Sequence, residues 1–176
     1  MTKPAETTVS TSTNARFVIW MLVAIVVAVA DQVTKWAIVE WVALYDKVPI
    51  NSFINLTHQK NSGAAFSFLA DAGGWQRWFF VALASAVSVV IAVWLWRIRN
   101  AGQTVLSAGL ALVLGGAIGN LVDRILLGHV TDFIQVWFGN WAFPSFNVAD
   151  AGISVGAALL IMDALFFSGR EERAAK

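Results

Sequence analysis

Two aspartates stand at the edges of apolar runs in the second half of the chain. Asp132 lies in "HVTDFIQVWF", and Asp150 opens an apolar stretch long enough to cross most of a bilayer. Two carboxylates that lie close together do not both ionise readily, so the pair shares a proton and titrates as a unit. The ionised member can draw a proton from water while the protonated one donates to a carbonyl oxygen. At a membrane edge, such a pair would hydrolyse a peptide bond near the lipid headgroups.

Several other polar residues have a structural explanation that the sequence leaves open. Asp31 and Lys35 are four residues apart with the acid first, the favourable order for a pair within one helix near the surface. Arg124, beside Asp123 at the end of an apolar run, would complement the negative end of a helix dipole. Asp150 could serve only as a helix cap, since aspartate is favoured at that position. A capping role does not explain Asp132, which has no basic neighbour in the sequence.

Other hydrolytic chemistries find little support. His58 and His129 have no second ligand at metal-binding spacing, and no "HExxH" occurs. Ser62 and Lys60 could in principle pair, but both sit in a predicted turn. There is no cysteine, which excludes disulfides, thiolate catalysis and cysteine-ligated zinc. We therefore expect neither a metal nor a cofactor.

The composition indicates an integral membrane protein. The 176 residues are 58% hydrophobic and 13% charged, with a mean hydropathy of +0.68, whereas soluble domains carry about 25% charged residues. The net charge of +1 gives no surface for nucleic acid. We expect one domain that acts as a monomer.

Four apolar runs are each long enough to span a bilayer as a helix. The sequence predicts a single membrane domain over residues 16–168, between a mobile tail at 1–15 and a tail at 169–176. The predicted spans are about 17–39, 75–96, 104–122 and 150–167. Glycines recur in the third span and favour close helix packing. Lysine and arginine in the flanks place both termini in the cytoplasm and residues 41–74 and 123–149 outside.

The first outer segment mixes β-branched, aromatic and polar residues in partial alternation, which predicts short strands with a turn at "KNSG". The predicted fold class is therefore an all-α polytopic membrane protein with four transmembrane helices and a small extracytoplasmic β-rich cradle.

Five blocks resemble, in order and spacing, the signatures of the bacterial lipoprotein signal peptidases. They are "DQVTK" (31–35), "NSGAAF" (61–66), "GNLVDR" (119–124), "VTDF" (130–133) and "FNVAD" (146–150). This resemblance implies a membrane aspartyl peptidase of the bacterial inner membrane, with its active site at the outer face. Its substrates would be prolipoproteins, cut on the N-terminal side of the diacylglyceryl-modified cysteine, and membrane lipid would be a further partner.

The resemblance also implies roles for individual residues. Asp132 and Asp150 correspond to the catalytic pair, although Thr131 stands where valine is common. The residues that correspond to substrate-binding or supporting positions are Asp31, Lys35, Asn61, Gly63, Asn120, Asp123, Arg124 and Asn147. The G-x-G-D motif of other membrane aspartyl proteases is absent.

Two other classes remain as alternatives. Intramembrane carboxylates with basic partners also mark ion or proton pathways in small transporters, but those lie near the bilayer midplane, often between inverted repeats. Here the polar residues gather toward one side and the two halves show no repeat. A scaffold protein would not need such a one-sided group of acids.

Overall fold

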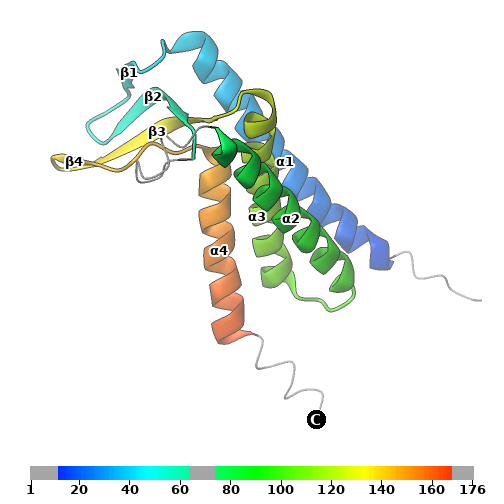
Figure 1. The fold of residues 1–176 in the computed structure, drawn as a ribbon. Coiled ribbons are helices and arrows are strands. Elements are labelled where there is room, and N and C mark those ends of the chain that lie inside the picture. The colour runs from blue at the N-terminus through cyan, green and yellow to red at the C-terminus, as the bar shows by residue number, and fades with distance from the viewer. Residues whose placement is uncertain (1–11, 64–73, 168–176) are drawn as a thin grey trace, which may run out of the picture.

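Four long helices and a small sheet make up the fold (Figure 1). The computed structural model describes residues 12–63 and 74–167. The helices are α1 (Ser12–Trp41), α2 (Trp75–Arg97), α3 (Thr104–Leu126) and α4 (Val148–Phe166). Each is long and apolar enough to cross a membrane, so the predicted four-helix architecture is confirmed.

The helix ends differ from the predicted spans. Helix α1 begins at Ser12, so residues 12–15, which we expected in the N-terminal tail, are helical. Helix α3 continues to Leu126, four residues beyond its predicted end, and α4 begins at Val148. Polar residues extend α1 at its start and α3 at its end, whereas α4 begins earlier because its N-cap is Asn147. The rest of the two predicted tails lies outside the described residues.

The two outer segments form one antiparallel sheet in the order β1-β2-β3-β4. Its strands are β1 (Lys47–Pro49), β2 (Ile54–Asn61), β3 (Val130–Phe138) and β4 (Trp141–Ala142). Strand β2 comes from the first outer segment and pairs with β3 from the second, with Gln59 opposite Asp132. The strands predicted in the first outer segment are confirmed. Strand β2 includes Lys60 and Asn61, and the chain bends at Gly63, the last residue of "KNSG". Strands β3 and β4 of the second outer segment were not predicted.

Helix α3 is the centre of the bundle. In the most apolar 18-residue stretch of α3, 56% of the residues are buried. The corresponding stretches of α1 and α2 have 11% of their residues buried, and that of α4 has 17%. Its glycines allow this packing: a Cβ added at Gly115 would stand 2.5 Å from the carbonyl oxygen of Ala24 in α1. The predicted glycine packing face is therefore present.

The sheet lies at one end of the bundle and projects sideways past α4 (Figure 1). The first residues of α1 and the last residues of α4 lie at the opposite end. The polar residues singled out in the sequence meet where the sheet joins the bundle.

Candidate active site

Asn147 joins the two aspartates. Its side-chain amide donates to Oδ1 of Asp132 at 2.8 Å, and its backbone N–H donates to Oδ2 of Asp150 at 3.3 Å. Its side-chain oxygen accepts from the backbone N–H of Asp150 at 2.9 Å. The two carboxylates, one on β3 and one in the first turn of α4, are thus held on either side of a single asparagine.

The capping role that the sequence left open belongs to Asn147, which is the N-cap of α4. Asp150 is the third helical residue and completes a reciprocal capping box with it. Its other oxygen, Oδ1, accepts a hydrogen bond of 2.8 Å from the amide of Asn120. Asp150 therefore both stabilises the helix start and belongs to the polar cluster, and a carboxylate is favoured at this end of a helix.

Asp132 is almost completely enclosed, with 4% of its surface exposed. The Asn61 amide donates to its Oδ2 at 2.9 Å. Burial raises the pKa of Asp132 to about 6, and the negative charge of Asp150 adds to this. The hydrogen bonds from Asn61 and Asn147 and the charge of Lys35 oppose the rise. Asp132 therefore takes up a proton far more readily than an exposed aspartate.

A buried ion network lies behind the pair of aspartates. The Lys35 ammonium lies 2.7 Å from Oδ2 of Asp31 and 3.0 Å from Oδ2 of Asp123, and it donates to Oδ1 of Asn120 at 2.9 Å. Asn120 in turn donates to Asp150, so its amide is fixed at both ends. The predicted pair of Asp31 and Lys35 within α1 is confirmed, but its expected place near the surface is wrong, because both residues are buried. Their contacts connect α1 to α3 and α4.

The carboxylates of this network also bind the backbone. Asp31 accepts from the N–H of Ala149 at 2.8 Å, which ties α1 to the start of α4. Asp123 accepts from the N–H of Thr131 at 3.0 Å, directly before the aspartate of β3. Gln32 donates to Oδ1 of Asp123 at 2.8 Å. Sequence reasoning did not single out Gln32, although it lies beside Asp31 in the block "DQVTK".

Arg124 and Gly63 lie at the border of the cluster. The Arg124 guanidinium donates to the carbonyl oxygen of Asn120 at 3.3 Å and lies 5.1 Å from the centre of the Phe80 ring. Gly63 has a φ of +101°, and a Cβ there would overlap the same ring. Its N–H donates to Oδ1 of Asn61 at 2.9 Å. Phe80, which sequence reasoning also missed, thus supports both residues.

The histidines serve local structure. Nδ1 of His58 lies 2.9 Å from the carbonyl oxygen of Val42, and Nδ1 of His129 lies 3.1 Å from that of Leu127. Burial is the main cause of a lowered pKa at His129. Within the described ranges, no group of three histidine, cysteine, aspartate or glutamate side chains could hold a metal ion.

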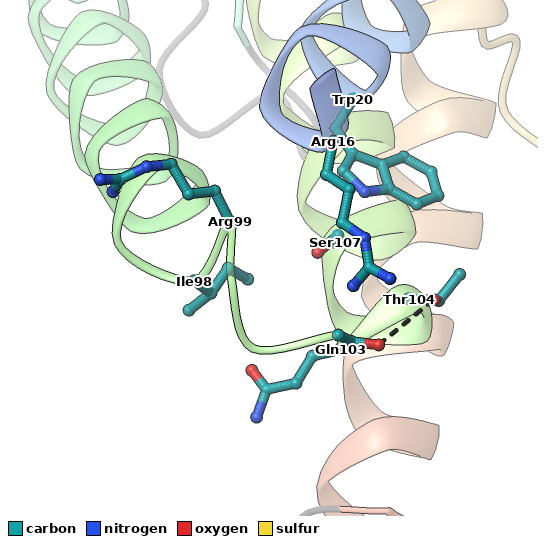
Figure 2. A pocket seen from close by; sticks show the side chains of 8 residues that line it. Arg16, Trp20, Ile98, Arg99, Gln103, Thr104 and Ser107 are labelled. Carbon is teal, nitrogen blue, oxygen red and sulfur yellow. Dashed lines mark hydrogen bonds between the residues drawn. The ribbon is translucent and has the colours of Figure 1, made fainter. Parts of the chain in front are cut away.

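A small polar cleft at the opposite end of the bundle is separate from this cluster (Figure 2). There the Arg16 guanidinium points toward the start of α3 beside Thr104 and Gln103. The cleft has a volume of about 20 Å³, which is little more than one water molecule needs. A peptide therefore cannot enter it.

Comparison with known proteins gives the family. The family model described as signal peptidase (SPase) II matches residues 23–166. The chain belongs to the signal peptidase II family. A lipoprotein signal peptidase of Ectopseudomonas mendocina is 51% identical over 82% of this chain and 86% of its own length. One from Yersinia pseudotuberculosis is 46% identical over 88% of this chain and 90% of its own.

The fold agrees with this assignment. A solved bacterial membrane enzyme, determined in meso at 2.3 Å resolution, superposes with a TM-score of 0.73. It is 30% identical, and the match covers 84% of this chain and 87% of the solved one. As a signal peptidase II, the chain is a multi-pass bacterial membrane protease. The transporter and scaffold alternatives are therefore wrong.

Proposed function

We propose that this chain is a membrane aspartyl endopeptidase that removes signal peptides from prolipoproteins on the N-terminal side of the diacylglyceryl-modified cysteine. Membership of the signal peptidase II family supports the activity. The observation that carries the assignment of catalytic residues is the Asn147 bridge, which holds Asp132 and Asp150 together. The chemistry needs only two carboxylates and a water molecule, so no metal or cofactor takes part.

In the proposed reaction, Asp132 holds the shared proton and Asp150 is ionised. The raised pKa of Asp132 supports this division, as does the place of Asp150 in a first helical turn. Asp150 takes a proton from water while the water oxygen attacks the scissile carbonyl carbon, and Asp132 donates its proton to the carbonyl oxygen. When the C–N bond breaks, Asp150 returns the proton to the leaving nitrogen, and Asp132 recovers its own from the hydroxyl group.

The supporting residues fix the positions of these two carboxylates. Asn61 and Asn147 orient Asp132, while Asn120 orients Asp150 and is itself held by Lys35. The remaining supporting residues do not hydrogen-bond to the two catalytic carboxylates. Asp31 and Asp123 hold Lys35, and Arg124 and Gly63 shape the border of the cluster.

The lipid on the substrate sets the depth of the scissile bond. A signal-peptide helix alone can slide along the membrane normal, whereas each buried methylene of a diacylglyceryl group contributes about 0.8 kcal/mol of anchoring. This arrangement requires both termini in the cytoplasm and the active site at the outer face of the inner membrane. The basic flanks of the helices support that orientation, and one chain suffices for the reaction.

Comparison of lipidated and unlipidated prolipoprotein at saturating concentration tests this proposal. We expect a large loss of kcat without the lipid, because the lipid positions the bond as well as binding it. Equal kcat values for the two substrates would mean that the lipid is only a tether. Absence of cleavage with either substrate would refute the peptidase assignment itself.

A further inference from the structure

Strand β2 places Gln59 directly opposite Asp132 on β3. Directly opposed residues of an antiparallel pair have their side chains on the same face of the sheet, with Cβ atoms about 5 Å apart. Gln59 is half-buried, whereas Asp132 is buried. A neutral amide side chain therefore stands beside one of the two catalytic candidates, and it is not among the supporting residues described above.

A β-bulge creates this arrangement. The two strands change register between Leu56 and Gln59, where β2 holds one residue more than β3. Without that extra residue, His58 would stand opposite Asp132. Instead, Nδ1 of His58 lies 2.9 Å from the carbonyl oxygen of Val42, just past the end of α1. Bulges beside active sites commonly re-aim a side chain, and this one brings Gln59 to the face of the sheet that carries Asp132.

That face of the sheet is turned away from α1. Phe133, the neighbour of Asp132 on β3, packs in a buried cluster with Ile38 of α1. Successive side chains of a strand point to opposite faces, so Asp132 and Gln59 share the other face. A substrate must contact the carboxyl group of Asp132, and it therefore passes Gln59.

The side-chain amide of Gln59 is unpaired within the described residues. Asn61, Asn120 and Asn147 each donate to one of the two catalytic carboxylates, whereas no such contact involves the side chain of Gln59. Its N–H groups and its oxygen thus remain available as donor and acceptor. A half-buried amide that loses its water when a substrate binds needs a polar partner on that substrate.

We propose that Gln59 binds the main chain of the substrate beside the scissile bond. In an extended peptide, the N–H and C=O groups of one residue point to the same side, as they do between paired antiparallel strands. The Gln59 amide accepts from that N–H and donates to that C=O, while the scissile carbonyl lies at the two aspartates. This contact keeps the chain in register without reading its side chains. The inference rests on the proposed peptidase function and adds to it a residue that contacts the substrate.

Kinetics of the purified full chain on a synthetic diacylglyceryl-modified peptide test this proposal. Gln59→Met keeps the length of the side chain and removes its donor and acceptor. We expect kcat/KM to fall about tenfold, the effect of two neutral hydrogen bonds, with the same pH dependence as in the wild type. Lys60→Met, the control, changes the adjacent exposed residue on the other face of β2 and should keep kcat/KM. An unchanged kcat/KM in Gln59→Met, or a shifted pH profile, would overturn the proposal.

Ester substrates test the contact itself. Three peptides each carry an ester oxygen in place of one main-chain N–H: at the last residue before the cut, at the second residue before it, or at the residue after the cysteine. One of them should lower kcat/KM of the wild type about threefold more than that of Gln59→Met, because the variant has no hydrogen bond to lose. Equal effects of all three on both enzymes would refute the contact. No cleavage of the all-amide peptide by the wild type would refute the peptidase function, and this inference with it.

Discussion

Replacement of Asp132 by asparagine should stabilise the fold at neutral pH. Burial raises the pKa of this carboxyl from 3.8 to about 6, while in the unfolded chain it ionises near its ordinary value. Between these two values the native state binds more protons than the unfolded state, so stability falls as the pH rises from about 4 through about 6. At 1.36 kcal/mol for each pKa unit, the rise from 3.8 to about 6 destabilises the wild type at neutral pH by at most ~3 kcal/mol.

An amide is a fair substitute for the protonated acid. The two Asp132 oxygens face the amide N–H groups of Asn61 and Asn147. A protonated carboxyl can still accept at both oxygens, whereas the asparagine NH2 group only donates and therefore faces one of these amides donor to donor. The variant removes the cost of ionisation but adds this mismatch, so its gain in stability is smaller than the upper limit.

Thermal unfolding in detergent from pH 4 to pH 8 measures this effect. Asp132→Asn should unfold several degrees above the wild type at pH 7.5, and the gap should close toward pH 4. Asp46→Asn, which removes a carboxylate from an exposed turn, should follow the wild-type curve. A variant that is less stable than the wild type at pH 7.5 would refute the argument from buried ionisation.

Three further outcomes are expected. Gly63→Ala should lower kcat at least tenfold, because the added Cβ meets the Phe80 ring. Gly139→Ala should keep its activity, since a Cβ there meets nothing within 4 Å. Equal activity of the two variants would contradict the role of the bend at Gly63. Chelators should leave cleavage unchanged, and a loss that zinc restores would reveal a metal. Single cysteines at Ser52 and Gly139 should react with an impermeant thiol reagent in spheroplasts and one at Asn100 should not, and the reverse pattern would invert the orientation.

Local signals were enough to predict the helices and the strands of the first outer segment. Apolar runs of bilayer length marked the four spans, and partial alternation marked β1 and β2, whereas β3 and β4 were not predicted. The helix ends were less predictable, because polar residues such as Ser12 carry no periodic signal. Asp150 illustrates a different limit: its residue type allowed an N-cap, and only the structure assigns that position to Asn147.

The contacts that build the site are long-range and could not be derived from spacing. Lys35 reaches Asn120 across 85 positions, and Asn61 reaches Asp132 across 71. The resemblance to a family indicated which residues belong to the site, but not which side chains hydrogen-bond to one another. Phe80 and Gln32 were missed because one looks like any aromatic residue of a span and the other like a neutral neighbour of an acid.

Cleavage of a diacylglyceryl-modified prolipoprotein by purified Asp132→Asn and Asp150→Asn variants tests the central claim most directly. Asp163→Asn is the matched control, because Asp163 is a buried aspartate on the same helix as Asp150, ~20 Å along its axis at 1.5 Å per residue. Each of the first two variants should fold and lose cleavage by a factor of ~10³ or more, while Asp163→Asn should keep near-normal turnover. Near-normal turnover by either Asp132→Asn or Asp150→Asn would contradict the two-aspartate mechanism.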